Sequence, residues 1–327
     1  MERLGETVVP ITVDKSRALK KWLKPAHACV AALHGLVLIG LVSLRASTRS
    51  KVSVHLLEET FQHMDPSRKC ECQPSASLET LGTKVNVFAL CVVFSSAVIF
   101  AHAFYATDGF GSNLYTHFVA NGKNPFRWCE FSITATSMML VMAILSGVRQ
   151  RVQLVVMCLA SVGTMVQGYS IEAAIAGGLG ALDRIFPLVA GWALFAATWY
   201  PILYSWYERL DHVAQFDNKC KSVDAYDEKT QPPRWIETLV LSMFVLFAYF
   251  GLVSLGHVIH SFRLEGDPAT MRDRFIFYEF FYMALSLVVK TMLNIWAMAA
   301  IFADEDGLVW LRGRAAADGN QCVSYRI

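Results

Sequence analysis

Charged residues are scarce in this 327-residue chain: 17% are Asp, Glu, Lys or Arg, against about 25% in soluble domains, and 54% are hydrophobic. The charges are also unevenly distributed, because long stretches carry almost none and the polar residues gather between them. A soluble protein would spread its charges along amphipathic helices. The composition therefore argues against the soluble classes and indicates a polytopic membrane protein.

The chain also lacks a dominant sign of charge and the short motifs of several functional classes. Its 29 Lys and Arg nearly balance its 27 Asp and Glu, which gives no sign of a nucleic-acid partner. The Cys-Glu-Cys run at 70–72 has no second cysteine pair at zinc-site spacing, and the Gly-rich run at 177–180 lacks the context of a phosphate loop. No span carries a His-Glu-x-x-His or Gly-x-Ser-x-Gly motif. We therefore expect neither an enzyme nor a metal centre.

Seven apolar segments are each long enough to cross a bilayer as a helix, which takes about 20 residues. They are 26–44, 85–107, 126–146, 152–176, 185–206, 235–261 and 275–303. Membrane β-strands are shorter and alternate in polarity, and backbone groups in lipid must be satisfied internally, so all seven are expected to be helices. The fold class is then all-α, a seven-transmembrane-helix bundle at 26–303, with an N-terminal segment at 1–25 and a tail at 304–327.

The longest connection, 45–84, follows the first span. Val52, Val54 and Leu56 alternate there with polar residues, which predicts a short strand. A loop of this length on a compact bundle is usually functional or a contact surface. No convincing cleavage site follows the first span, so we expect a retained helix and not a signal peptide.

Charged residues inside a span cost at least about 2.5 kcal/mol each on insertion and are candidates for function. Six occur: Arg127, Glu130, Glu172, Glu237, Glu279 and Lys290. Glu237 is close enough to a helix end to reach water. We expect Glu172 and Glu279 to be solvated helix ends, and His257 and His260 to be solvated as well.

Lys290 lies about 20 Å from either end of its span, too deep for its amine to reach water. A buried lysine readily forms a Schiff base, and the alternative is an ion pair that joins two helices. A protonated Schiff base needs a counterion, and Glu130 is the natural partner because the third and seventh helices run in the same direction. Arg127, one turn earlier, can hold that carboxylate ionised. Ser286, one turn before Lys290, can hydrogen-bond the site.

Two histidines, His34 and His102, lie at a depth in the membrane similar to that of Glu130. His34, His102 and Glu130 all lie within roughly 6–12 Å of the face that holds the N-terminus. An imidazole near a carboxylate can accept and hold a proton at physiological pH. The alternative, that both histidines are hydrogen-bonded packing residues, stays open.

Seven helices, a lysine in the seventh and a carboxylate in the third together resemble a retinal-binding, rhodopsin-like bundle. The run 124–135, Asn-Pro-Phe-Arg-Trp-Cys-Glu-Phe-Ser-Ile-Thr-Ala, is similar to the third-helix signature of heliorhodopsins, an Arg-Trp-x-Glu-Tyr-Ser run that carries the counterion. The run 286–291 is similar to their Ser-x-x-x-Lys-Thr. His34 and His102 match the family's paired histidines. Phe131 departs from the pattern, since the family usually has Tyr there.

The resemblance implies all-trans retinal bound covalently to Lys290, with Glu130 as its counterion. The other residues it places around the cofactor are Ser286, Arg127, Trp128, Thr134, His34 and His102. It further implies a slow photocycle suited to sensing, a homodimer, a signalling partner that the sequence does not identify, and an inverted orientation with a cytoplasmic N-terminus and an extracellular C-terminus.

Ion transport can be judged from two positions. Pumping rhodopsins have a second carboxylate 11 residues after the counterion and an Asp one turn before the lysine; here these residues are Val141 and Ser286. We therefore expect a light sensor without net pumping. The alternative is a light-gated proton channel that uses Glu172, Glu279 or the histidines. A G-protein-coupled receptor is disfavoured, because Asp-Arg-Tyr and Asn-Pro-x-x-Tyr motifs are missing from the third and seventh helices.

Two sequence features disagree on orientation. The side of the membrane that holds the N-terminus has 11 Lys and Arg residues and the other side has 16, which favours an external N-terminus. Four cysteines fall on the side opposite the N-terminus, namely Cys70, Cys72, Cys220 and Cys322. Disulfides there would indicate an oxidising compartment, and hence a cytoplasmic N-terminus, which we adopt. The four cysteines inside spans are expected to be packing residues: Cys29, Cys91, Cys129 and Cys158.

Overall fold

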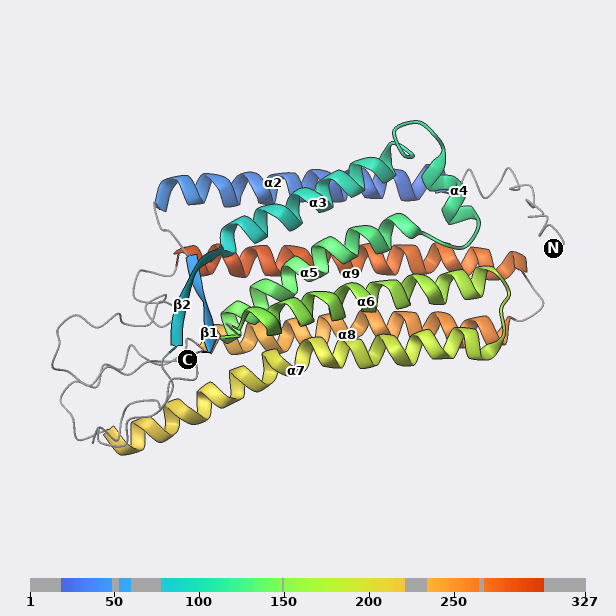
Figure 1. Cartoon of the computed structure of the whole chain (residues 1–327). Coiled ribbons are helices and arrows are strands. Elements are labelled where there is room, and N and C mark those ends of the chain that lie inside the picture. The colour runs from blue at the N-terminus through green and yellow to red at the C-terminus, as the bar shows by residue number, and fades with distance from the viewer. Residues whose placement is uncertain are drawn as a thin grey trace.

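The computed structural model describes residues 19–48, 53–59, 78–148, 150–220, 234–264 and 268–302. In these ranges seven long helices lie side by side in one bundle (Figure 1). The helical elements are η1 (Leu19–Leu23), α2 (Lys24–Thr48), α3 (Val87–Ala106), α4 (Leu114–Ala120), α5 (Pro125–Ser146), α6 (Arg151–Ala176), α7 (Ala181–Cys220), α8 (Arg234–Arg263) and α9 (Pro268–Phe302).

The seven long helices are apolar enough to cross a membrane, and the predicted all-α bundle is confirmed. Their candidate spans are 21–46, 87–106, 125–146, 151–176, 181–207, 236–263 and 274–296, each within a few residues of the predicted segment except at the start of the first and fifth and the end of the seventh. The chain is therefore an integral, multi-pass membrane protein. Helix α7 continues to Cys220, well past the predicted end of its span (Figure 1).

The long loop contributes two antiparallel strands, β1 (Ser53–Glu59) and β2 (Leu78–Asn86). The strand predicted from Val54 and Leu56 is confirmed, while Val52 lies outside the described residues. β2 leads directly into α3, so the pair sits at the end of the bundle where α2 finishes (Figure 1). We call this the hairpin end, and the opposite end, where α2 begins, the entry end.

Helix α5 is the central helix of the bundle, since 72% of its span is buried against at most 39% in the others. It starts with Pro125 at its first turn, and the side-chain oxygen of Asn124 accepts the backbone N–H of Arg127 at 3.2 Å. Its end is set by Gly147, whose φ of +99° is a left-handed conformation that favours glycine. Figure 1 shows α5 beginning farther inside the bundle than α9 does at the entry end.

The short helix α4 lies at the entry end and is held there by Asp108 (Figure 1). The Asp108 carboxylate accepts the backbone N–H of Thr116 at 2.8 Å and its hydroxyl at 2.9 Å, and pairs with Lys24 of α2 at 2.7 Å. Burial alone would raise the pKa of Asp108, but the hydrogen bonds from Lys24 and Thr116 outweigh it and hold that pKa below its usual value. Asp108 thus caps α4 from outside the helix and ties it to α2.

The two halves of the bundle differ in what they bury. The hairpin half packs a large apolar cluster that includes Leu41, Met138, Val141, Trp199 and Leu293. The buried acidic, basic and histidine side chains of the described residues gather in the middle and toward the entry end: His27, His34, His102, Asp108, Arg127, Glu130, Glu172, Arg184, His257, Glu279 and Lys290. The buried polar residues of the hairpin half, such as Ser95, Ser146 and Asn294, carry no charge.

The prediction that the four cysteines inside spans are packing residues is confirmed only in part. Cys91 is buried in the apolar cluster as expected, and Cys158 is half-buried. Cys29 and Cys129 are exposed on the outer surface of their helices, so the prediction that they pack inside the bundle is wrong. Cys70, Cys72, Cys322 and the side chain of Cys220 lie outside the described residues.

Candidate functional site

Lys290 of α9 and Glu130 of α5 form a buried ion pair, with 3% and 6% of each residue exposed. Thr134, one turn after Glu130, donates its hydroxyl to the same carboxylate oxygen at 3.0 Å. Glu130 reaches this depth although it is only a little over one turn into its helix, because α5 begins inside the bundle. The sequence prediction that places these two side chains together agrees with this geometry.

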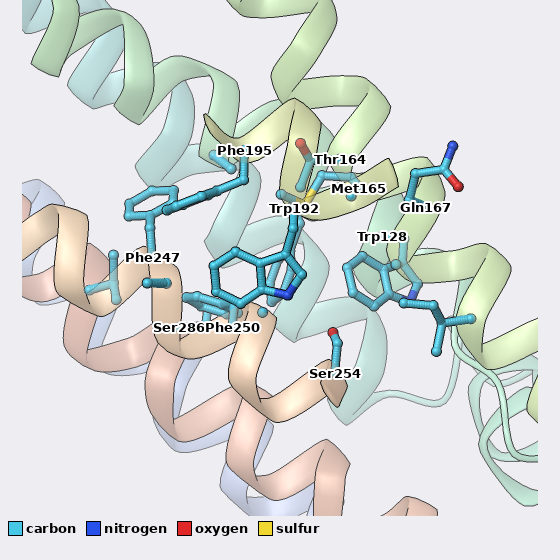
Figure 2. Close-up of a pocket in the computed structure, with 18 of the residues that line it drawn as sticks. Trp128, Thr164, Met165, Gln167, Trp192, Phe195, Phe247, Phe250, Ser254 and Ser286 are labelled. Atoms are coloured by element: carbon cyan, nitrogen blue, oxygen red, sulfur yellow. The ribbon is translucent and has the colours of Figure 1, made fainter. Parts of the chain in front are cut away.

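Next to the pair lies a pocket that encloses about 770 Å³ of space between the side chains, part of it open to the surroundings. Residues of helices α5 to α9 line it, and Lys290, Ser286 and Thr134 are among its few polar ones. Aromatic rings make up much of the wall. They are those of Phe131 and of five residues labelled in Figure 2: Trp128, Trp192, Phe195, Phe247 and Phe250. The pocket can therefore hold a flat apolar molecule with one end at Lys290.

Two glycines create the room for the tryptophans of this wall. A Cβ on Gly251 of α8 would come within 2.6 Å of the Trp192 ring, and a Cβ on Gly168 of α6 would overlap the Trp128 ring. Both indoles therefore lie directly against a neighbouring helix backbone. Trp128 is among the residues predicted around the cofactor, whereas Gly168 and Gly251 were not identified from the sequence. An isolated glycine inside a helical span was the available signal, because it often marks such a close approach.

The Ser286 hydroxyl is buried beside Lys290 and lines the pocket. In the described part of the chain it has no hydrogen-bond partner, and neither has the hydroxyl of Thr291, the residue after the lysine. A buried hydroxyl without a partner is costly, so Ser286 has a donor and an acceptor to offer to a group attached at Lys290.

A second buried charge cluster lies between the ion pair and the entry end. Arg127 pairs with Glu172 of α6 and with Glu279 of α9, rather than holding Glu130 as the sequence predicted. Asn124 donates its backbone N–H to Glu172 at 3.1 Å and its side-chain amide to Glu279 at 3.3 Å. The guanidinium also lies over the Tyr282 ring at 4.2 Å.

The expectation that Glu172 and Glu279 are solvated helix ends is wrong, since 1% and 2% of these residues are exposed. His257 is also buried, with its ring 4.6 Å from that of Tyr278, while His260 is half-buried and hydrogen-bonds the Tyr278 hydroxyl. The number of residues from a helix end did not predict the exposure of these side chains, because the helices begin at different levels and cover one another's ends.

The structure pairs His102 with His27, which is not among the site residues predicted from the sequence. Their Nδ1 atoms are 2.8 Å apart, and Nε2 of His27 is 2.8 Å from the hydroxyl of Tyr115 on α4. His34 lies two turns deeper on the same face of α2, fully buried and within electrostatic range of Lys290. Among the described residues neither ring nitrogen of His34 has a hydrogen-bond partner.

A small cavity with mostly polar lining residues lies among these groups and encloses about 250 Å³, part of it open to the surroundings. Its wall includes the counterion candidate, the second charge cluster and the histidine pair: His27, His102, Tyr105, Asn124, Arg127, Glu130, Glu279 and Ser286. No group of three or more His, Cys, Asp or Glu side chains in the described ranges is arranged to hold a metal ion.

A comparison with models of protein families shows to which family the chain belongs. The heliorhodopsin family model matches residues 20–302, which include all seven long helices. The chain belongs to the heliorhodopsin family. No curated protein sequence matches it. Heliorhodopsins are seven-helix membrane proteins that bind retinal and sense light.

The site fits the cofactor of the heliorhodopsins. Retinal is a flat polyene aldehyde, and the pocket offers an amine at Lys290 together with a slot between aromatic rings. Gly168 and Gly251 keep Trp128 and Trp192 against the helix backbones, so the slot stays open beside them. The unpartnered Ser286 hydroxyl lies at the amine end of this slot. These features of the protein alone favour retinal over a bulky or polar ligand.

Proposed function

We propose that the protein is a light sensor that carries all-trans retinal on Lys290 as a protonated Schiff base, with Glu130 as the counterion. The observation that carries the proposal is the buried Lys290–Glu130 ion pair on the wall of an aromatic pocket. A buried ion pair adds little net stability, because desolvation offsets most of the attraction between its charges. A function at this position is the better reason for two charges inside a membrane.

The protein's own residues have separate tasks in this proposal. Lys290 supplies the amine, and Glu130 offsets the positive charge that persists there. Thr134 holds the carboxylate through its hydroxyl, at 3.0 Å, and keeps it facing Lys290. Trp128 and Trp192 flank the chromophore and exclude water. When bound, retinal supplies the light absorption that no side chain has in the visible range.

Net pumping is not part of the proposal. A pump needs proton-binding groups on both sides of the chromophore. In the described ranges the buried titratable groups lie at the level of Lys290 or toward the entry end, apart from Cys91 in the hairpin half. Val141, at the position of the pump's second carboxylate, is fully buried in the apolar cluster. Protons exchanged at the site therefore return to the side they came from, which suits a slow sensory photocycle.

A light-gated proton channel is the second candidate. Glu130, Glu279 and Glu172 favour it, because these buried carboxylates extend in one direction toward the entry end. Conduction would also require water to enter the apolar hairpin half during illumination. Photocurrents under voltage clamp separate the candidates: a current that reverses with voltage supports the channel, and its absence supports the sensor.

The orientation, the homodimer and the signalling partner are proposals as well. Resemblance to the family supports all three, and the one-sided cysteines support a cytoplasmic N-terminus. An epitope tag on the C-terminus should be stained on intact cells, and one on the N-terminus only after permeabilisation. The opposite staining pattern would reverse the assigned orientation.

The attachment site can be tested by chemistry. Purified protein is incubated with all-trans retinal, reduced with borohydride to fix the Schiff base as an amine, digested and analysed by mass spectrometry. The retinyl group should be found on Lys290 and on no other lysine. Lys24, which is engaged by Asp108, is the internal control. Attachment elsewhere, or none, would contradict the proposal.

A further inference from the structure

The cluster around Arg127 holds more negative than positive charge. Lys290 and Glu130 neutralise each other, so Arg127 is left with two carboxylates, Glu172 and Glu279. All three side chains are more than nine-tenths buried. An uncompensated charge in such a place is far more costly than a neutral carboxyl group, and two carboxylates that share one site do not both ionise readily.

Among the described residues, the side chains that face the pair add no cation beyond Lys290, which Glu130 neutralises. The titratable or charged side chains that face the cluster are His27 from α2, His102 and Tyr105 from α3, Tyr115 from α4, Glu130 from α5, His257 and His260 from α8, and Tyr278, Tyr282 and Lys290 from α9. Arg184 of α7 is directed instead to Ser261 of α8, at 3.3 Å from its hydroxyl. A bound proton is therefore the simplest way to neutralise the cluster.

Other polar groups adjoin the cluster, and one set of them ends at a half-buried histidine. The Arg127 guanidinium lies against the Tyr282 ring, and the Tyr282 hydroxyl is 2.7 Å from that of Ser254. Buried His257, within electrostatic range of Arg127, packs on Tyr278, whose hydroxyl bonds half-buried His260 near the end of α8. Toward the hairpin end, the described residues beyond Lys290 are mostly those of the apolar cluster, and the buried polar ones among them, such as Ser137 and the Ser95–Asn294 pair, carry no charge.

We propose that Glu172 and Glu279 share one exchangeable proton at neutral pH, and that it exchanges with water at the entry end by way of Tyr278 and His260. Protonation breaks one O–H bond of a hydronium ion, leaves water and forms one carboxyl O–H bond; deprotonation is the reverse, and no electrons are gained or lost. The inference goes beyond light absorption, because it applies to the protein with or without retinal. On this proposal, the buried carboxylates of the entry half bind a proton that exchanges with water on one side of the membrane only.

Infrared spectroscopy of the retinal-free protein tests the shared proton. A protonated carboxyl group gives a C=O stretching band that ionised carboxylates lack, and ¹³C-labelled glutamate assigns it to Glu. We expect the band at neutral pH, its loss in both Glu172→Gln and Glu279→Gln, and its persistence in Glu130→Gln. Glu237→Gln is the matched control, since Glu237 is half-buried at the start of α8 and should leave the band intact.

Absence of the band from the wild-type protein, or its persistence in both single variants, would overturn the shared proton. If a glutamine variant fails to fold, ¹³C labelling of the wild-type protein still decides, because a band that is missing or unlabelled contradicts the proposal. Since the protein carries no retinal in this experiment, failure of the light-sensor proposal would leave the result unchanged.

The exchange route has its own test. After transfer into D₂O, the band shifts at the rate at which the proton exchanges. Tyr278→Phe and His260→Leu should each slow this shift by about tenfold or more, the effect of removing a proton-transfer group. Ser95→Ala, at the buried pair on the hairpin side of Lys290, is the control and should not change the rate. Unchanged exchange rates in both Tyr278→Phe and His260→Leu, or a slower rate in Ser95→Ala, would overturn the route.

Discussion

Lys290 and Glu130 are 160 residues apart in the sequence, yet their side chains form one buried ion pair at the centre of the bundle. Helix α5 delivers Glu130 to this depth by starting inside the bundle, and α9 delivers Lys290 from the middle of a much longer helix. Each charge would be costly to bury alone, so each position depends on the other. The first prediction concerns what happens when one of the two charges is removed.

Glu130→Gln keeps the size of the side chain and removes its negative charge. In the retinal-bound protein this charge stabilises the ground state, in which positive charge sits at the nitrogen, more than the excited state. The visible band should therefore shift to the red, or disappear at neutral pH if the cation no longer persists. Absorption spectra across a pH series measure both effects. Glu237→Gln is the control, and a spectrum and titration identical to wild type in Glu130→Gln would remove it as counterion.

Gly251→Ala should disturb the chromophore through Trp192. The added Cβ would come within 2.6 Å of the indole, which must then move toward the pocket. Overpacking of this kind costs about 1–3 kcal/mol, and only part is recovered by the better helix propensity of alanine, about 0.5–1 kcal/mol.

Slower retinal uptake and a displaced absorption maximum are the expected readouts of Gly251→Ala. Gly256→Ala on the same helix is the matched control, since its Cβ meets the Tyr278 side chain at an ordinary 3.6 Å from the hydroxyl and 3.8 Å from a ring carbon. If the two variants bind retinal alike, with the wild-type spectrum, Trp192 does not shape the pocket.

Asp108→Asn should lower the free energy of unfolding by about 1–3 kcal/mol at neutral pH, because charge-assisted hydrogen bonds to Lys24 and Thr116 are weakened. Asn tolerates the left-handed backbone at this position, where φ is +59°, so the change removes charge and little else. The folded-state pKa of Asp108 lies below its unfolded value of about 3.9.

The contribution of Asp108 is therefore complete above the unfolded pKa and is lost as the pH falls through the folded one. Thermal melts of both proteins over a pH series should show a gap that is full at neutral pH and closes in acid. A gap that stays constant as the pH is lowered would mean that the carboxylate charge does not stabilise the α4 cap.

Illumination of cells or vesicles that contain the protein should give no sustained net proton transport. The reason is the apolar hairpin half, where the buried residues that the structure describes around Val141 include no carboxylate and no histidine. External pH is recorded with and without an uncoupler. A persistent light-driven pH change that the uncoupler abolishes would reveal a relay through that half.

Much of the fold and the centre of the site follow from the sequence. Hydropathy predicts the seven spans because backbone groups in lipid leave no alternative to long helices. Lys290 is found from its depth alone, and Glu130 from the need of that lysine for a partner. Depth is a property of a single helix, so these inferences need no tertiary information.

The partners of Arg127 could not be obtained in this way. Glu172 and Glu279 are near helix ends in the sequence, but Asn124, which precedes the deep start of α5, lies against both carboxylates and α4 lies at the same end. The pairing of His102 with His27 depends likewise on the rotation of α2 against α3. Gly168 and Gly251 matter only because of the rings that face them. Each of these depends on how neighbouring helices are placed, which hydropathy does not record.

The central claim is that Lys290 holds retinal, and the absorption spectrum after addition of all-trans retinal tests it most directly. Wild-type protein and Lys290→Ala are purified without retinal, checked for folding, and compared. The account predicts a visible band in the wild type and none in Lys290→Ala, which absorbs only where free retinal does. A normal visible band in a folded Lys290→Ala protein would contradict it.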